Sequence, residues 1–235
     1  MEYINHKEKL KDIKLDKNNF YVMIDFDRTI TKAKSFSAWR VLYYSELLGE
    51  KFKQKYADIH DETELSKSES NEAKQKAFEQ RFMAYMDLLR DCHFNKDILE
   101  RAVEKTDLTL HDGVEEFFRK MYENNIPVII ISCSIKNVIE EYLIQNHAYY
   151  DNIHIYANYL DMNGKKENDV TNVTPYNKNE IEFSEKVKEN IEDKKYIVLL
   201  GDITDDVNMV SKEKLNHTIT IGFLEKDIEK KFRKI

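Results

Sequence analysis

The stretch of sequence that decides the fold is an apolar run ending in two acids: Phe20-Tyr21-Val22-Met23-Ile24-Asp25-Phe26-Asp27-Arg28-Thr29. Its first five residues are rich in aromatic and β-branched side chains, which is typical of a buried strand in a parallel sheet. The two acids would then lie at the carboxyl end of that strand. Ligands bind at this edge of open α/β sheets, so the stretch predicts a parallel sheet with a polar site at its edge.

A second stretch of the same kind lies near the C-terminus. The apolar run 196–200 is followed by Gly201-Asp202-Ile203-Thr204-Asp205-Asp206. Two strands far apart in sequence can direct their carboxylates to one point, and converging carboxylates need a cation because unpaired buried charges are costly. The two stretches together indicate phosphoryl chemistry that depends on a bound metal.

The rest of the chain predicts more strands and a long helical segment. Strands are expected at residues 20–25, 127–132, 153–157, 196–200 and 218–222. Apolar residues at helical spacing over 114–122 and 135–143 alternate with these strands, which predicts a parallel α/β sheet. No strand is expected between residues 32 and 105. Helices are expected there instead, over 33–55, over 72–89, and from an N-cap at Asn95 through Val103.

The acidic motifs resemble the first and fourth motifs of the haloacid dehalogenase (HAD) superfamily of phosphohydrolases. The resemblance rests on Asp25-x-Asp27-x-Thr29 and Gly201-Asp202-x-x-x-Asp206, in that order, with Ser132 and Lys178 as candidates for the motifs between them. It implies a Rossmann-like parallel-sheet core, residues 1–31 and 106–235. It also implies an all-helical cap domain, residues 32–105, inserted between the first and second motifs as a mobile lid.

The resemblance implies a role for each acid. Asp25 attacks phosphorus to give an aspartyl-phosphate, while Asp27 protonates the departing alcohol and then activates water. Mg²⁺ is held by the carboxylates of Asp25 and Asp202 and by the backbone carbonyl of Asp27, and Asp206 orders this shell.

Ser132 and Lys178 are the candidates for phosphate binding. Ser132, expected where a strand meets a helix that starts near Ser134, can donate hydrogen bonds to phosphate with help from the helix N-terminus. Lys178 adds a positive charge. Helix capping is the alternative for Ser132, and an ordinary surface position is the alternative for Lys178. Thr29 and Ser134 complete the substrate-binding candidates from the motifs.

A narrower resemblance, to the cytosolic pyrimidine 5'-nucleotidase family (5'-nucleotidase III), rests on residues 150–155, Asn158, Gly164, 176–178 and 221–224. It implies hydrolysis of pyrimidine nucleoside 5'-monophosphates. The family's base-contacting glutamate falls at or near His60, and Phe82 and Tyr85 occupy positions that pack around the nucleobase. An ordinary exposed histidine and core packing of the aromatic side chains are the alternatives.

Composition limits the partners. The 235 residues include 44 Asp and Glu against 37 Lys and Arg, a net charge of −7, which argues against binding a nucleic acid polymer or an anionic membrane. No apolar run approaches the roughly 20 residues of a membrane span, and the first residues are too polar for a signal peptide. We therefore expect a cytoplasmic enzyme with a small-molecule phosphate ester as its partner and leave its oligomeric state open.

Two rival functions remain at this point. Helical caps of this kind serve several substrates, so a HAD phosphatase acting on phosphoserine or a sugar phosphate is the first alternative. A more distant one is a noncatalytic phosphoacceptor regulatory domain, which also uses strand-end aspartates, Mg²⁺ and a lysine. Such domains are about half this length and carry the accepting aspartate on a middle strand, whereas here it ends the first strand.

Overall fold

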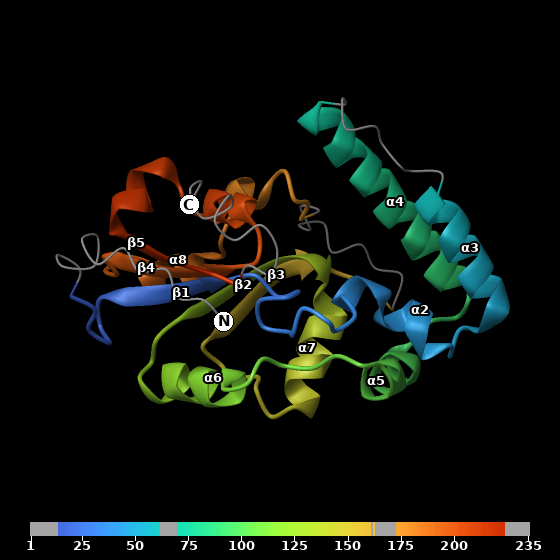
Figure 1. Ribbon diagram of the computed structural model, residues 1–235, viewed down its shortest axis with the longest axis horizontal. Helices are drawn as coiled ribbons and strands as arrows, with labels where there is room; N and C mark the ends of the chain where they lie inside the picture. The colour runs from blue at the N-terminus through green and yellow to red at the C-terminus, as the bar shows by residue number, and fades with distance from the viewer. Residues whose placement is uncertain (1–13, 62–69, 161, 163–172, 224–235) are drawn as a thin grey trace.

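A parallel five-stranded sheet forms the centre of the computed structural model (Figure 1). The structure describes residues 14–61, 70–160, 162 and 173–223, without the side chains of His60 and Asp61. The strands are β1 (Phe20–Ile24), β2 (Val128–Ile135), β3 (Ile153–Asn158), β4 (Tyr196–Gly201) and β5 (Thr218–Gly222). Their order is β3-β2-β1-β4-β5, and every neighbouring pair is parallel. The predicted parallel sheet is confirmed, and the order makes β1 and β4, which carry the acidic motifs, direct neighbours.

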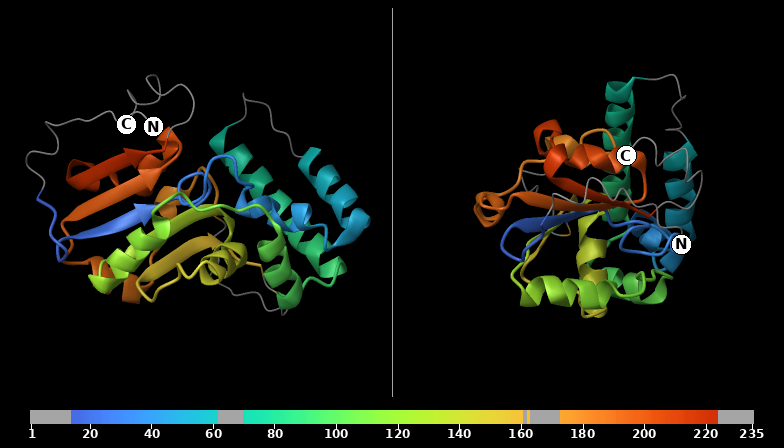
Figure 2. Two further views of the ribbon diagram at one scale, coloured as in Figure 1. Left: turned by 60° about the horizontal axis from the view of Figure 1, so that its bottom comes forward. Right: turned by 60° about the vertical axis from the view of Figure 1, so that its left-hand side comes forward.

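Strands β1, β2 and β4 are buried on both faces, which explains why they read as continuous apolar runs, whereas the edge strand β5 is partly exposed. Val22 and Ile24 of β1 pack into one hydrophobic cluster with α6 (Val114–Glu123) and α7 (Lys136–Gln145). Tyr21 and Met23 face the opposite cluster with α8 (Glu185–Ile191) and the 3-10 helix η3 (Thr204–Met209). The sheet therefore lies between two helical layers (Figure 2).

The segment predicted to be helical contains η1 (Ala38–Arg40), α2 (Val41–Ser45), α3 (Gly49–Asp61), α4 (Asn71–Asp91) and α5 (Lys96–Lys105), and no strand among its described residues. Asn95 caps α5 as predicted, because its side chain accepts from Ile98 N at 3.1 Å. The single helix expected over 33–55 is wrong. Glu46 adopts a left-handed conformation with φ of 63° and ends α2, and α3 begins only at Gly49.

The helical segment has a base and a projecting hairpin. The base consists of α2 and α5: α5 packs against both α2 and α7, and Tyr142 of α7 donates to Leu108 O at 3.0 Å. The hairpin of α3 and α4 extends away from the sheet in all views (Figures 1 and 2). The two connections to the core run together, since Lys32 N donates to Thr109 O at 2.7 Å. On this basis we propose residues 32–105 as the bounds of the cap.

Two further short 3-10 helices lie beside the sheet. These are η2 (Lys178–Glu180), which lies beside η3, and η4 (Lys212–His217), which leads into β5. None of the helices that the structure describes is long and apolar enough to cross a membrane.

Candidate active site

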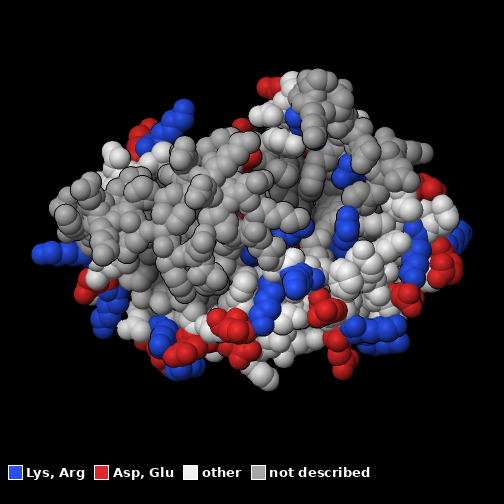
Figure 3. All heavy atoms as spheres, viewed as in Figure 1, with Lys and Arg blue, Asp and Glu red and all other residues white. Residues whose placement is uncertain are grey.

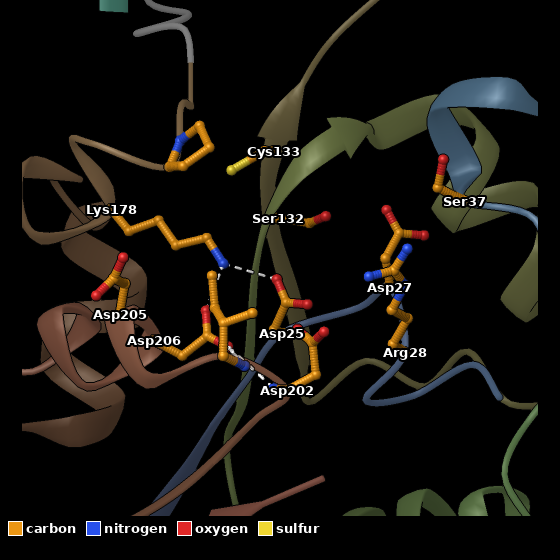
Figure 4. A pocket seen from close by; sticks show the side chains of 12 residues that line it. Asp25, Asp27, Arg28, Ser37, Ser132, Cys133, Lys178, Asp202, Asp205 and Asp206 are labelled. Atoms are coloured by element: carbon orange, nitrogen blue, oxygen red, sulfur yellow. Dashed lines mark hydrogen bonds and ion pairs between the residues drawn. The ribbon is translucent and has the colours of Figure 1, made fainter. Parts of the chain in front are cut away.

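A cavity of about 260 Å³ opens at the carboxyl edge of the sheet (Figure 4). Twelve residues line it: Asp25, Asp27, Arg28, Ser37, Ser132, Cys133, Pro175, Lys178, Asp202, Ile203, Asp205 and Asp206. They come from the carboxyl ends of β1, β2 and β4, from η2 and the loop before it, from η3 and from the first residues of the cap. The structure thus brings together six of the predicted site residues that are separated by up to 181 positions in sequence, from Asp25 to Asp206.

The backbone after β1 explains how Asp25 and Asp27 reach this cavity. Asp25 N donates to Leu200 O at 3.0 Å, so the pairing with β4 continues one residue past the strand. The chain then closes a tight turn in which the backbone N–H groups of Ile30 and Thr31 donate to Phe26 O. This turn places the side chains of Asp25 and Asp27 on the same side of the sheet edge.

Lys178 joins the two acidic motifs. Its Nζ lies 2.7 Å from Asp25 Oδ1 and 2.8 Å from Asp206 Oδ1, and all three side chains are buried. Burial lowers the pKa of Lys178, but the charges of Asp25 and Asp206 outweigh it and hold the pKa above its ordinary value. Burial raises the pKa of Asp25, and the charge of Lys178 opposes that rise. Lys178 is therefore a buried cation bound to the motifs, and the surface position considered for it is wrong.

Asp206 is fixed by the backbone as well as by Lys178. Its Oδ2 accepts from Asp202 N at 3.1 Å and from Ile203 N at 3.2 Å. Gly201 leaves the space that this carboxylate fills, because a Cβ on Gly201 would lie 2.4 Å from Asp206 Oδ2. The glycine of the second acidic stretch is therefore a packing requirement of the site.

Asp27 is held by the second strand and by the cap. Ser134 Oγ donates a short hydrogen bond to Asp27 Oδ2, and Ala38 N in η1 donates to Asp27 Oδ1 at 2.8 Å. Burial raises the pKa of Asp27, and these two hydrogen bonds oppose the rise. Ser134 thus orients Asp27, and its predicted contact with substrate stays a prediction. The bond from Ala38 could not be predicted, because a backbone N–H leaves no signal in the side-chain pattern.

Ser132 lies on the cavity wall but not at the start of a helix. Strand β2 continues to Ile135, past a register shift against β3, and α7 begins only at Lys136. The helix expected over 135–143 is present, but it starts at Lys136 with Ile135 as its N-cap, two residues after the expected start near Ser134. The capping role considered for Ser132 is therefore wrong. Ser132 is 1% exposed and its Oγ accepts from Ser134 N at 3.1 Å, which leaves its own proton for a ligand.

The other substrate-binding candidates do not line the cavity. Thr29 is buried behind it, and its Oγ1 finds no hydrogen-bond partner among the described residues. Phe82 and Tyr85 are buried in the aromatic core of the cap, where both rings contact Trp39. His60 lies in α3, but its side chain is outside the description. Contact of these residues with substrate stays a prediction.

Two asparagines support the loop that carries Lys178. Asn158 Nδ2 donates to Cys133 O and to Val173 O, both at 2.8 Å, and Asn177 Oδ1 accepts from Thr174 N at 2.7 Å. Both residues belong to the sequence blocks that carry the narrower resemblance. Burial raises the pKa of the Cys133 thiol to about 12, which disfavours the thiolate that a nucleophilic cysteine needs.

The acids of the cavity suit a divalent cation. One carboxylate oxygen from each of Asp25, Asp202 and Asp206 lies within 4.8 Å of the others. Burial and the charge of Asp206 together raise the pKa of Asp202 to about 6. This crowding of carboxylates is relieved by a cation, and a set of oxygen ligands alone is what Mg²⁺ prefers.

Relatives of the chain are nucleotidases. The 7-methylguanosine phosphate-specific 5'-nucleotidase A of Xenopus laevis is 27% identical over 225 residues, which cover 88% of this chain and 76% of that protein. The corresponding Homo sapiens enzyme is 30% identical over 141 residues, covering 57% of this chain and 46% of its own length.

Solved structures share the fold. Cytosolic 5'-nucleotidase IIIB bound to cytidine superposes with a TM-score of 0.72 at 19% identity, over 93% of this chain and 78% of that one. A probable phosphoserine phosphatase from Vibrio cholerae gives a TM-score of 0.56 at 15% identity, over 92% of this chain and 60% of that one. Both likenesses establish the HAD fold with its cap.

The chain also matches a protein-family model. The model described as pyrimidine 5'-nucleotidase (UMPH-1) matches residues 27–235, which is most of the chain and includes the cap and all motifs after Asp25. The chain therefore belongs to the pyrimidine 5'-nucleotidase family and is a phosphoric monoester hydrolase.

Proposed function

We propose that this protein is a Mg²⁺-dependent 5'-nucleotidase that hydrolyses nucleoside monophosphates through an aspartyl-phosphate on Asp25. The observation that supports it most is the cluster of Asp25, Asp202 and Asp206 around Lys178, with Asp27 on the same cavity. A nucleophile, a proton donor and a cation site within one pocket are the groups that hydrolysis of a phosphate monoester needs.

The cation site is assigned to three carboxylates and one carbonyl. Asp25, Asp202 and Asp206 would hold Mg²⁺ together with the backbone carbonyl of Asp27. When bound, the ion neutralises phosphate charge and polarises a phosphoryl oxygen. Asp206 also has a second task, because its contacts with Lys178 and with the backbone of Asp202 and Ile203 keep the cluster in place.

Asp25 is the proposed nucleophile. Lys178 holds its Oδ1, and the other oxygen is available to attack phosphorus. As the new Asp25 O–P bond forms, the bond from phosphorus to the ester oxygen breaks, and that oxygen takes a proton from Asp27. Burial raises the pKa of Asp27, which favours the protonated form that this step requires.

The second half-reaction returns the enzyme to its starting state. Asp27, now a carboxylate, accepts a proton from a water molecule while the water oxygen bonds to phosphorus and the Asp25 O–P bond breaks. Inorganic phosphate leaves, and Asp27 is again protonated. Ser134 and Ala38 fix the orientation of Asp27 through both steps. Ser132 is assigned the role of donating its hydroxyl proton to a phosphoryl oxygen, which its free proton and its position on the cavity wall support.

The cap is the proposed source of substrate selectivity. Ser37 lines the cavity, and its neighbours Phe36 and Trp39 are partly exposed aromatic residues. Aromatic faces stack on any planar base and favour a cationic one such as 7-methylguanine. The family description names pyrimidine nucleotides and the relatives are named for 7-methylguanosine phosphate, so both are proposed as substrates to compare first.

A panel of phosphate esters tests the proposal. Phosphate release is measured with Mg²⁺ for CMP, UMP, 7-methyl-GMP, AMP, GMP, a 3'-nucleotide, phosphoserine and a sugar phosphate. We expect a pyrimidine nucleotide or 7-methyl-GMP to have the highest kcat/KM and the 3'-nucleotide to be poor. If phosphoserine or the sugar phosphate exceeds every nucleotide, the nucleotidase assignment is wrong and only the phosphatase assignment survives.

A further inference from the structure

The cavity is lined by an arginine that has no role in the mechanism proposed above. Arg28 is the fourth residue of the first motif and lines the cavity. Its side chain is exposed. Its backbone N–H donates to Thr31 Oγ1 at 3.0 Å, but its guanidinium makes no hydrogen bond or ion pair with any residue that the structure describes. Its donors are therefore available to a ligand.

The charges of the cavity make this arginine unusual. Five carboxylates line the cavity, those of Asp25, Asp27, Asp202, Asp205 and Asp206. The cations of the described lining are Lys178 and Arg28, and Lys178 is buried and already bonded to two of the acids. A phosphate dianion that enters this acidic pocket meets Arg28 as the cation whose donors are not engaged. Figure 3 shows Lys and Arg side chains gathered at the hollow between core and cap on the face seen there, which agrees with an anionic ligand.

Its position places Arg28 across the cavity from Lys178. In Figure 4 it lies beside Asp27, with Asp25 between it and Lys178. The group that Asp27 protonates is attached to the phosphate, which brings that phosphate within reach of a side chain as long as arginine.

The backbone of Arg28 adds an independent observation. Its φ is 65°, in the left-handed region that favours glycine and that long side chains seldom adopt. Such conformations cluster at functional sites, where the side chain has a use that offsets the strain. Glycine would fit this turn with less strain, so the turn itself does not call for an arginine.

We infer that Arg28 binds the phosphate group of the substrate from the side of the cavity opposite Lys178. A guanidinium presents parallel N–H donors that match two oxygens of one phosphate, a geometry that lysine cannot reproduce. The inference rests on the proposed phosphatase activity. It does not depend on the nucleotide preference, because every phosphate monoester carries the group that Arg28 contacts.

Three variants test the inference. Arg28→Gly removes the side chain and accepts the positive φ without strain, so it is not expected to lower the melting temperature. Arg28→Lys keeps the charge without the paired donors. Arg119→Gln is the control: Arg119 is a surface residue of α6 that does not line the cavity, so this change removes one positive charge elsewhere.

The readouts are steady-state kinetics with Mg²⁺ on an aryl phosphate and on CMP, and calorimetric binding of inorganic phosphate. For Arg28→Gly we expect KM for both esters and Kd for phosphate to rise together by about 10–100-fold, the worth of a charge-assisted hydrogen bond. The kcat should change much less, since the contact is made in ground state and transition state alike. The KM and Kd values of Arg28→Lys should lie between those of the wild type and of Arg28→Gly. Those of Arg119→Gln should match the wild type.

Two results would overturn the inference. Unchanged KM and phosphate Kd in Arg28→Gly would mean that the guanidinium does not contact phosphate. An effect seen with CMP but not with the aryl phosphate or inorganic phosphate would place Arg28 on the nucleoside instead. Failure of the proposed function is distinguishable, because a wild-type enzyme that cleaves the aryl phosphate but no nucleotide still allows the variants to be compared.

Discussion

The sheet edge and the cap hold their side chains in different ways, and under the proposed function this difference separates chemistry from selectivity. At the sheet edge, charged groups are buried and bonded to one another, as in Lys178 between Asp25 and Asp206. In the cap, the buried residues are almost all aliphatic or aromatic, and Phe78, Phe82 and Tyr85 pack around Trp39. A buried network of charges tolerates few substitutions, whereas an aromatic core tolerates changes of similar shape.

The two regions meet at one point. Ala38, in the first turn of the cap, donates its backbone N–H to Asp27, and Ser37 beside it lines the cavity. Under the proposed mechanism, residues 37–38 at the start of the cap therefore support the proton donor, and the α3–α4 hairpin is the part that can vary. We expect changes at the sheet edge to alter the rate for all esters and changes in the hairpin to alter selectivity or stability alone.

The largest effect is expected from Asp25→Asn, which removes the nucleophile. Phosphate release from every ester should fall by at least about 10³, because an amide does not attack phosphorus. Asn has nearly the same shape, and Lys178 keeps its ion pair with Asp206, so circular dichroism should show an unchanged fold. Release near the wild-type rate would refute the nucleophile assignment.

Asp27→Asn is expected to lower kcat by about 10²–10⁴, the usual contribution of a positioned acid and base. Ser134→Ala is the milder variant for comparison, because it removes one of the two hydrogen bonds to Asp27 and leaves the acid itself in place. The fall in kcat for Ser134→Ala should be several-fold smaller than for Asp27→Asn. The assignment fails if Asp27→Asn is as active as Ser134→Ala when both are assayed on an ester whose leaving group needs a proton.

Asp202→Asn should raise the Mg²⁺ concentration needed for half-maximal activity by about 10-fold or more, since it removes one charged ligand of the cation. Its KM for the ester at saturating Mg²⁺ should change much less. Excess chelator should abolish activity of the wild type, and added Mg²⁺ should restore it. Full activity in the chelator would exclude the metal assignment.

Gly201→Ala tests whether the space at Gly201 is needed to hold the Asp206 carboxylate in place. The added Cβ would lie 2.4 Å from Asp206 Oδ2 and must displace that carboxylate from Lys178 and from Asp202 N. Overpacking of this kind costs about 1–3 kcal/mol of unfolding free energy. Urea unfolding should show that loss, together with a raised Mg²⁺ requirement. Wild-type stability and metal dependence would mean that Asp206 is not held in this way.

Tyr85→Phe should give the smallest effect and tests the cap. Tyr85 is 1% exposed and its hydroxyl has no hydrogen-bond partner among the described residues. Removing an unsatisfied buried hydroxyl should stabilise the protein by about 1 kcal/mol and leave kinetics unchanged. If KM instead rises for nucleotides but not for an aryl phosphate, the hydroxyl contacts the nucleobase, as the family resemblance predicts.

The sheet and most of the edge could be predicted from the sequence because their signals are local. A buried parallel strand reads as an apolar run, and Asp25, Asp27, Asp202 and Asp206 follow directly from such runs. Ser132 was found for the same reason, although β2 continues past it because its pairing with β3 resumes after a register shift. That pairing is a tertiary effect that the run 127–132 does not encode.

The rest depends on contacts between distant segments. The break of the first cap helix at Glu46 and the bond from Ala38 to Asp27 both involve backbone geometry, which side-chain periodicity does not report. Helical spacing placed Phe82 and Tyr85 on one face of α4 but could not tell whether that face meets substrate or the cap core. The structure buries both against Trp39.

The measurement that tests the central claim most directly is a rapid acid quench with a ³²P-labelled phosphate ester. During turnover with Mg²⁺, the wild type should carry acid-stable label on one peptide, at Asp25. With an aryl phosphate whose leaving group needs no proton, Asp27→Asn should accumulate more of this label, because only hydrolysis of the aspartyl-phosphate is slowed. Asp25→Asn should carry none. A wild-type enzyme that releases phosphate at full rate while label is absent, or is found on another residue, would contradict the account.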